Sequence, residues 1–435
     1  MNADASLADE LNTFMLAACM ECTSEDNAFI ITEHAVRNTF RRVNTRRAAG
    51  PDAIPGRVLR ACADQLAPVF TEIFNLSLAQ AVVPVCFKES IIVPVPKKQQ
   101  PACHNDYRPV ALISVVMKCF ERLMRAHITS SLPASTDPLQ FAYRTNRSRD
   151  DAISHLLHTS LSHLDTGRGN YVRMLFVDVQ PTSDPTSIVK FADDTVVVGL
   201  ISDNIETTYL EEIRNLKTWC QENNLLLNVS KTKELIVDFT TKQTRNYKLL
   251  IISGTPVERV DSFRYLGVHI TQDLSWSCHI NTLVKKARQR LFFLRRLRDF
   301  HLPLRVLKNF YSCAIESVLT GNICPWFGNS TKQDRRDLQR VVRSAERIIR
   351  SELPDRLSIY TKRCKTKARK IMMDLSHPNN GLVSLLRSGK RFRSLKAKAE
   401  RMRRSFFPRA IRALNQRSEE HIPLCSWHIQ CSGEV

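Results

Sequence analysis

Residues 188–201 read IVKFADDTVVVGLI, a largely apolar segment that two adjacent carboxylates interrupt. Short apolar runs on either side of a polar break predict two strands joined by a tight turn. Asp193 and Asp194 then lie at the tip of a hairpin. Two like charges beside apolar walls raise each other's pKa and destabilise the fold unless a cation neutralises them. This segment therefore constrains the chain to a β-hairpin that carries a carboxylate pair.

A divalent metal ion is the usual partner of such a pair. Hard oxygen ligands favour Mg²⁺, which binds one or two protein carboxylates and completes its shell with water and substrate phosphates. Residues 171–179 (YVRMLFVDV) predict a buried strand with Asp178 near its end. Asp178 would complete a two-metal site for in-line attack on a phosphate. For the Asp-Asp dipeptide by itself, simple turn chemistry remains the alternative.

The basic residues are concentrated in one part of the chain, whose formal net charge is +21. Residues 281–420 hold 35 Lys and Arg against 11 Asp and Glu, whereas the rest of the chain holds 29 against 32. This asymmetry predicts a region that binds a polyanion, with nucleic acid as the leading candidate. A solvated helical face is the alternative for any single cluster. The predicted nucleic-acid-binding patch is Lys285, Lys286, Arg288, Arg295 and Arg296.

Composition excludes several other classes. The chain is 43% hydrophobic and 25% charged, close to globular averages, and its 13 cysteines are too sparse for a disulfide scaffold. We therefore expect a reducing compartment. The first ten residues contain three carboxylates and no Lys or Arg, and no apolar run reaches 18 residues. We expect neither a signal peptide nor a membrane span, no membrane partner, and an intracellular location, nuclear or cytoplasmic.

Two cysteine patterns resemble parts of a zinc site. Cys19 and Cys22 have the spacing of one ligand pair, and Cys425, His428 and Cys431 form a second short cluster. Neither has a second pair at structural zinc spacing. Ordinary small apolar thiols are the simpler interpretation.

Hydrophobic periodicity predicts an α+β fold, with strands in the first two thirds and basic helices after about residue 279. The expected helices are 33–43, 57–81, 114–132 and 205–223, with Pro68 kinking or dividing the second. The expected strands are 90–96, 171–179, the hairpin 188–201, 234–239 and 263–270.

Phe191-Ala192-Asp193-Asp194 resembles the F/Y-x-D-D motif of reverse transcriptases, in the form found in non-LTR (LINE-type) retrotransposons. Other stretches resemble that family in the same order. They are AGPDAIP at 49–55, NDYRPVAL at 105–112, LQFAYR at 139–144 with Arg147, FVD at 176–178, Leu226 and Asn228 with KTK at 231–233, and FRYLGV at 263–268. The set covers about residues 30 to 415.

The resemblance implies a right-hand polymerase fold with fingers, palm and thumb. The expected regions are an N-terminal helical lead-in at 1–47, fingers and the start of the palm at 48–170, a palm with the FADD hairpin at 171–275, a basic helical thumb and C-terminal region at 276–420, and an unassigned tail at 421–435.

The same resemblance implies roles for individual residues. The catalytic metal ligands, for Mg²⁺ or Mn²⁺, are Asp178, Asp193 and Asp194. The expected nucleotide and template contacts are Lys97, Arg108, Lys231 and Lys233, with Lys98 either a further contact or solvated. The expected primer grip is Tyr265, Leu266 and Gly267, with Tyr265 alternatively a core aromatic. The implied partners are an RNA template, a DNA primer and deoxynucleoside triphosphates, without a small-molecule cofactor.

The chain departs from the family after Asp178. Only the twelve residues 179–190, VQPTSDPTSIVK, separate it from Phe191. In the family this interval spans several tens of residues and includes the sugar-discriminating aromatic and a helix-borne G-x-P-Q-G segment. Our hypothesis for the short interval is an internal deletion or a skipped exon. Because positioning is most of phosphoryl-transfer catalysis, we expect little or no polymerase activity, and part of the apolar sheet exposed.

Two other hypotheses remain open at this point. The chain is alternatively a catalytically inactive, nucleic-acid-binding remnant of a transposon. A third hypothesis is that the chain is a non-functional, unstable translation of transposon sequence. In either case it looks like a fragment of a larger element's product.

Overall fold

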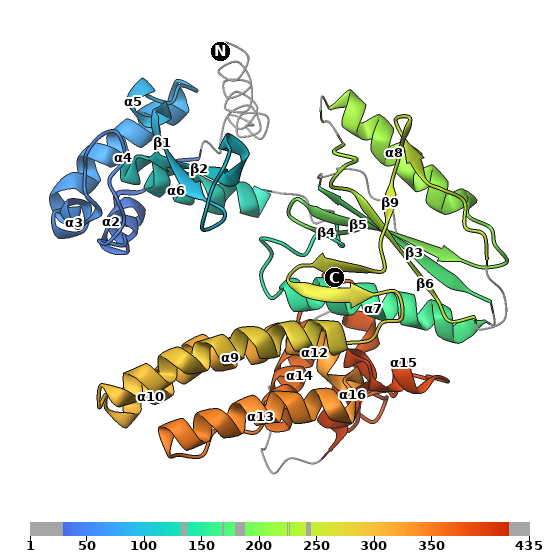
Figure 1. Cartoon of the computed structure of the whole chain (residues 1–435). Coiled ribbons are helices and arrows are strands. Elements are labelled where there is room, and N and C mark those ends of the chain that lie inside the picture. Colours follow the sequence, from blue (N-terminus) through green and yellow to red (C-terminus); the bar gives the residue numbers. More distant parts are fainter. Residues whose placement is uncertain are drawn as a thin grey trace, which may run out of the picture. The chain divides into compact units, whose positions relative to one another are not determined.

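The computed structural model describes residues 29–131, 137–167, 169–178, 188–223, 225, 227–240 and 245–416. The chain divides into two compact units, Met1–Thr136 and Asp137–Val435 (Figure 1). Residues 137–170, which we expected within the fingers and the start of the palm, belong to the second unit. Most of the predicted lead-in at 1–47 and all of the tail at 421–435, with both cysteine patterns, lie outside the described residues.

The first unit combines helices with one hairpin. Its helices are α2 (Glu33–Arg41), α3 (Gly56–Ala61), α4 (Ala63–Ala79), α5 (Val85–Lys88) and α6 (Val115–Ser131), and its strands are β1 (Ser90–Pro96) and β2 (Tyr107–Ile113). Aromatic side chains fill the core, where the rings of Phe74 and Phe120 stack at 4.6 Å. The helix expected over 57–81 is two helices. The break falls at Cys62 rather than at Pro68, which lies inside α4.

The AGPDAIP segment packs against the start of α6. A Cβ on Gly50 would meet the backbone nitrogen of Ser114 at 2.4 Å, so a glycine is needed for this close approach. The hydroxyl of Ser114 donates to the carboxylate of Asp52 and accepts from the N–H of Val116 at 3.1 Å. The motif therefore fixes the first turn of α6.

The second unit is built on a five-stranded sheet in the order β4-β5-β3-β6-β9. The strands are β3 (Tyr171–Asp178), β4 (Ile188–Phe191), β5 (Asp194–Ile201), β6 (Lys233–Asp238) and β9 (Glu258–Arg259). All neighbours are antiparallel except β6 and β9. The predicted strand over 171–179 and the predicted hairpin over 188–201 are thus present.

Helices cover both faces of this sheet. On one face, alternate β3 residues such as Met174 pack with α7 (Arg149–Thr166) and the C-terminal helices. On the other, Leu175 and its alternates pack with α8 (Thr207–Glu222) (Figure 1). The expectation of an exposed apolar sheet is wrong for the described residues of β3, β4 and β5. Their apolar side chains are covered, except that of Leu200, which is exposed. The reason is that α7 and α8 come from outside the shortened interval.

The strand expected over 263–270 is a hairpin of its own. Strands β10 (Ser262–Tyr265) and β11 (Val268–Thr271) pair in antiparallel register. The two residues between them, Leu266 and Gly267, have φ of 47° and 88°. Positive φ at both central positions is typical of a type I′ turn, which glycine favours. A second small hairpin joins β7 (Ile251–Ile252) to β8 (Thr255–Pro256).

The remainder of the second unit is largely helical, as its periodicity predicted, apart from a mostly irregular stretch over 374–399. The helices are α9 (Ser277–Asp299), α10 (Leu304–Phe310), α11 (Ser317–Leu319), α12 (Ile323–Trp326), α13 (Lys332–Ile349), α14 (Arg356–Met373), α15 (Glu400–Arg404) and α16 (Phe406–Asn415). They share one hydrophobic core with α7 and one face of the sheet. Among the described residues, no helix has the length and apolarity that a membrane crossing needs.

Candidate active site

The turn between β4 and β5 presents the carboxylate pair. Phe191 and Asp194 are register partners, so Ala192 and Asp193 form a two-residue loop. Both Asp193 and Asp194 are exposed. Ala192 has a φ of 57°, a conformation that costs a non-glycine residue about 1–3 kcal/mol. Backbone strain of this kind gathers at functional sites, where the surrounding structure maintains it.

The third carboxylate-bearing position lies on the neighbouring strand. The antiparallel register of β3 and β5 places Asp178 directly opposite Asp194. Directly opposed residues have Cα atoms about 4.5–5.5 Å apart. The side chain of Asp178 lies outside the described residues, so the structure brings together the two backbone positions.

A pocket of about 280 Å³ opens beside this turn. Its lining residues are Phe176, Val177, Asp193, Asp194, Thr195, Lys231, Phe263 and Tyr265. Two of the predicted contacts, Lys231 and Tyr265, therefore share a pocket with the carboxylate pair. The Lys231 side chain is exposed, so its positive charge lies in the same solvated space as the carboxylates.

Tyr265 is both a core aromatic and a pocket residue. It is 2% exposed, and its ring centroid lies 5.6 Å from that of Phe176, which stacks on Phe263 at 4.2 Å. Within the described chain its hydroxyl has no hydrogen-bond partner. Burial, reinforced by the negative charge of Asp194, raises the pKa of Tyr265 well above its usual value. The hydroxyl is therefore a protonated donor beside the carboxylates.

The rest of the predicted primer grip forms the β10-β11 turn. The carbonyl of Leu266 accepts from the side-chain amide of Asn322 at 3.0 Å, which ties this turn to the start of α12. Leu266 is buried. Gly267 has open space around it, since a Cβ at this position would lie 4.0 Å from its nearest neighbour, the side-chain nitrogen of Asn322. Gly267 thus serves the turn's backbone conformation.

Lys233 does not line the carboxylate pocket. Its ammonium group pairs with Glu258 at 2.6 Å and donates to the carbonyl of Ser230 at 2.8 Å. The contact with Glu258 fastens the start of β6 to β9, and the contact with Ser230 fastens it to the turn directly before β6. The companion position Leu226 of this motif lies outside the described residues.

The predicted fingers contacts belong to the first unit. Arg108 is exposed on β2, opposite Val95 on β1, and Lys97 follows β1 directly. Lys98 pairs with Asp106 at 2.8 Å, and this hydrogen bond lowers the pKa of Asp106 to about 2. Lys98 is thus part of an ion pair on the surface, and the roles of Lys97, Lys98 and Arg108 stay predictions.

Gln140 is a site residue that the sequence left without a role. Its side-chain Oε1 accepts the backbone N–H of Ala192 at 3.1 Å and that of Ala142 at 3.0 Å. It therefore contacts the turn that presents the carboxylates. The only signal in the sequence was its place in the LQFAYR stretch.

The donor chemistry of the pair fits a hard divalent cation, because Asp193 and Asp194 offer carboxylate oxygens at one turn. In the described part of the chain, no group of three or more His, Cys, Asp or Glu side chains is arranged to hold a metal ion. The third ligand would have to be Asp178, whose backbone the register places beside the pair.

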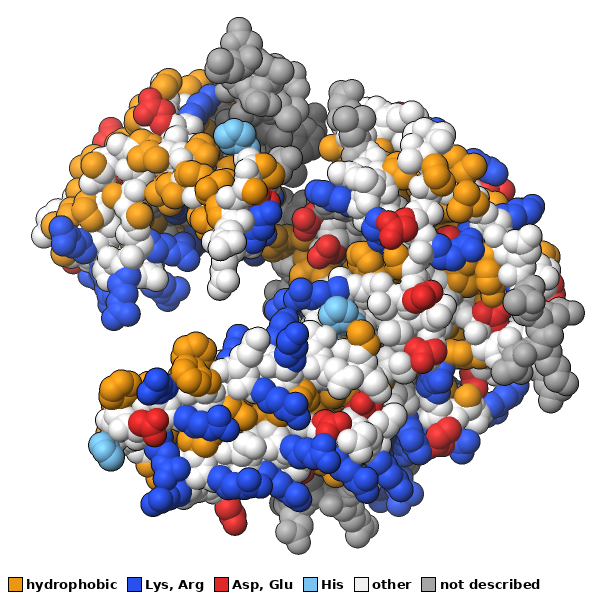
Figure 2. Space-filling model, viewed as in Figure 1, with side chains coloured by type: hydrophobic (Ala, Val, Ile, Leu, Met, Phe, Trp, Pro, Cys, Tyr) orange, Lys and Arg blue, Asp and Glu red, His pale blue; other side chains and the backbone are white. Residues whose placement is uncertain are grey.

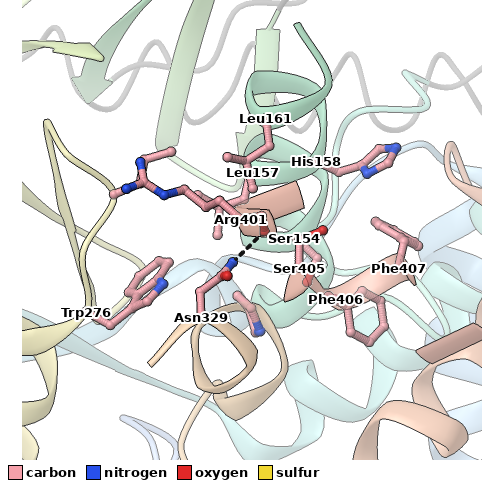
Figure 3. A pocket seen from close by; sticks show the side chains of 12 residues that line it. Ser154, Leu157, His158, Leu161, Trp276, Asn329, Arg401, Ser405, Phe406 and Phe407 are labelled. Carbon is pink, nitrogen blue, oxygen red and sulfur yellow. Dashed lines mark hydrogen bonds between the residues drawn. The ribbon is translucent and has the colours of Figure 1, made fainter. Parts of the chain in front are cut away.

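A second space in the core is too small for a substrate. It measures about 10 Å³, roughly the volume that one water molecule needs, and lies among α7, α15 and α16 (Figure 3). There Asn329 donates to the carbonyl of Arg401 at 3.0 Å. Burial lowers the pKa of the neighbouring His158 to about 4. This space is part of the core, and the pocket beside the carboxylates is the candidate site.

The predicted basic patch lies on the solvent side of α9. Its members Lys285, Lys286, Arg288, Arg295 and Arg296 are all exposed. Figure 2 shows Lys and Arg side chains gathered over the α9 and α13 region. Exposed Phe292 lies under the guanidinium of Arg296, 5.5 Å from ring centroid to Cζ. The patch is available to a polyanion.

Comparison with known proteins gives a short family match and three relatives. A family model described as "Alkylated DNA repair protein alkB homolog 8, N-terminal" matches residues 276–317, which include α9 and α10. The chain is 27% identical over 146 residues to the "Probable RNA-directed DNA polymerase from transposon X-element" of Drosophila melanogaster, covering 33% of this chain and 16% of that protein.

Two further relatives are each named "RNA-directed DNA polymerase from mobile element jockey", from Drosophila melanogaster and Drosophila funebris. Each is 24% identical over 157 residues, which is 35% of this chain and 17% of the relative. The chain thus spans about a sixth of the length of the curated relatives it matches. The observed mixture of helices and small sheets is compatible with a polymerase-like fold. The similarity supports a relationship to retrotransposon reverse transcriptases at the family level.

Proposed function

We propose that this chain carries the site of an RNA-directed DNA polymerase of the non-LTR type, which extends a DNA primer on an RNA template. The observation that carries the proposal is the register of β3 and β5, which aligns Asp178 with Asp194 beside Asp193. A structural hairpin turn would not need a third acidic position opposite it. The names of the three relatives support the same activity.

The three carboxylates are proposed to hold Mg²⁺ or Mn²⁺. When bound, the metal ions supply Lewis-acid stabilisation of the attacking and leaving oxygens of an in-line displacement. Asp193 and Asp194 orient their oxygens from a strained turn, and Asp178 adds a ligand from β3. The donor chemistry supports this assignment, since hard oxygen ligands select such cations.

Other pocket residues are proposed to position the substrates. The ammonium of Lys231 attracts the phosphates of the incoming deoxynucleoside triphosphate. The buried ring of Tyr265, which packs on Phe176, supports the primer end. In the first unit, Lys97 and Arg108 contact template or triphosphate, and the patch on α9 holds the phosphate backbone.

The activity is proposed to be weak. The twelve residues between Asp178 and Phe191 replace the segment that, in the resembling family, positions template and nucleotide. Effective alignment of reactants supplies much of the rate of such enzymes. A sheet that assembles without that segment retains metal ligands but lacks part of the substrate alignment.

Primer extension tests the proposal. The purified chain is given an RNA template, a labelled DNA primer, deoxynucleoside triphosphates and Mg²⁺ or Mn²⁺. We expect slow extension that disappears in the Asp193→Asn, Asp194→Asn variant. The absence of extension by a folded chain that still binds the template would overturn the proposal and leave a chain that binds nucleic acid without chemistry.

A further inference from the structure

The β4-β5 turn is held by a segment some fifty residues earlier in the chain. Residues 137–142 run beside β4, and Gln140 forms a parallel bridge with Lys190. The N–H of Lys190 donates to the carbonyl of Leu139 at 3.0 Å, and the N–H of Phe141 donates to the carbonyl of Lys190 at 2.9 Å. The outer edge of β4 is therefore paired, so the strand that leads into the turn is fixed.

A buried ion pair reinforces this pairing. The ammonium of Lys190 lies 2.6 Å from the carboxylate of Asp137, and the Lys190 side chain is 3% exposed. A buried pair of this kind specifies one alignment of its two segments, because any shift would leave a charge without its partner. The register of Gln140 against β4 is fixed in this way.

From that register the side chain of Gln140 reaches the turn itself. Its Oε1 accepts the N–H of Ala192, the residue with φ of 57°, and the N–H of Ala142. A strained turn persists only where surrounding groups favour its conformation over the relaxed one. The hydrogen bond to Ala192 supplies such a preference, since it holds the amide of the strained residue in one orientation.

Arg147 in turn anchors the segment that bears Gln140. Its Nη1 donates to the carbonyls of Pro138 at 2.6 Å and Gln140 at 3.2 Å, and its Nη2 donates to the carbonyl of Ser376 at 2.6 Å. The guanidinium is largely buried and spans from the segment before α7 to the turn that follows α14. The brace thus extends from the C-terminal region to the carboxylate turn.

We propose that Gln140 is a positioning residue for the carboxylate pair, whose amide oxygen holds Ala192 in the strained conformation that directs Asp193 and Asp194 into the pocket. The effect on metal binding rests on the proposed function, whereas the effect on the turn does not. Outer partners that orient metal ligands typically change metal affinity about 10- to 100-fold when removed.

The test compares Gln140→Leu and Gln140→Glu in the full chain. Leucine keeps approximate size but removes the acceptor, and glutamate restores an acceptor oxygen. Exposed Gln221 on α8 supplies the matched control, Gln221→Leu. Two quantities are measured, the hydrogen-exchange rate of the Ala192 amide and the dissociation constant for Mn²⁺.

We expect the Ala192 amide to exchange about fivefold faster in Gln140→Leu, the change anticipated for loss of one ordinary hydrogen bond. Gln140→Glu and Gln221→Leu retain the slow exchange. Mn²⁺ binds about tenfold more weakly to Gln140→Leu, with the remaining amides of the sheet still protected. Protected sheet amides show that the variant is folded.

An unchanged exchange rate of the Ala192 amide in Gln140→Leu overturns the inference, whatever the Mn²⁺ affinity of that variant. Faster exchange with unchanged Mn²⁺ affinity overturns the positioning role. If the wild-type chain binds no Mn²⁺, or binds it no more tightly than the Asp193→Asn variant does, the proposed function is contradicted instead. The exchange rate of the Ala192 amide still decides whether Gln140 holds the turn.

Discussion

Asp178 and Asp194 are direct register partners on the antiparallel strands β3 and β5. Strand pairing, rather than the short connection 179–187, therefore brings the two acidic positions together. The same pairing buries the apolar residues of both strands between α7 and α8. A chain with a shortened interval thus keeps the part of the site that depends on the sheet.

The carboxylate pair is expected to bind a divalent metal ion. Asp194→Asn is expected to weaken Mn²⁺ binding at least about tenfold, because a charged ligand is removed. Calorimetric titration measures the affinity. Asp203→Asn, at an exposed turn of the same unit, serves as control, and equal Mn²⁺ affinity in both variants would contradict the assignment.

Relief of strain at the turn is expected to stabilise the fold. Ala192→Gly should raise the free energy of unfolding by about 1 kcal/mol, because glycine adopts a φ near 57° without the Cβ penalty. Urea denaturation measures the change. Ala413→Gly, within α16, is expected to lower stability by about 0.5–1 kcal/mol, as glycine does in a helix. A loss of stability in Ala192→Gly would show that Ala192 is not strained.

A buried ionic network crosses the sheet away from the carboxylates. Arg173 is fully buried and pairs with Glu234 at 2.7 Å and Glu206 at 2.8 Å. Glu234→Gln is expected to lower the free energy of unfolding by about 3 kcal/mol, because it leaves a buried charge undercompensated. Urea denaturation measures this loss. Exposed Glu400, which pairs with Arg403 and Arg404 on the surface, gives the comparison, and Glu400→Gln is expected to cause no measurable change.

Stability is expected to fall on mild acidification. Burial lowers the pKa of His279 and of His377 to about 4. Because unfolded histidine titrates near about 6.5, the unfolded chain binds more protons between pH 6.5 and 4, and stability decreases as the pH falls through that window. Urea denaturation between pH 7 and 4.5 should show a shallower decline for His279→Gln than for the control His301→Gln, whose side chain is exposed. Parallel profiles would contradict the buried neutral state.

The basic face of α9 is expected to set the salt dependence of nucleic-acid binding. Lys285→Ala with Lys286→Ala should reduce the slope of log affinity against log salt by roughly 0.7–0.9 for each phosphate that is no longer neutralised. Fluorescence anisotropy with a labelled RNA over a salt series measures the slope. Arg214→Ala with Lys217→Ala on α8 removes the same charge elsewhere in the second unit. Equal slopes in the two double variants would exclude α9 as the binding face.

The local elements could be predicted from the amino-acid sequence. Apolar runs on either side of the Asp-Asp break predicted the β4-β5 hairpin, and helical periodicity predicted α6 and α8 to within two residues. These patterns depend on neighbours along the chain, so they can be read without tertiary contacts. The division of 263–270 into two strands was missed, although Gly267 was a signal for a turn.

Which elements meet could be seen only in the folded chain. The sequence predicted that Asp178 joins the carboxylate pair, but only the structure shows its direct register with Asp194. The burial of Tyr265 beside the carboxylates and the hydrogen bond from Ala192 to Gln140 likewise join residues distant in sequence. Lys233, like Lys231 a predicted nucleotide or template contact, also forms an ion pair with Glu258 that its place in the sequence did not indicate. Strand register and side-chain hydrogen bonds depend on how whole segments pack. The periodicity of one segment does not show which strand edge or helix face of another segment it will contact.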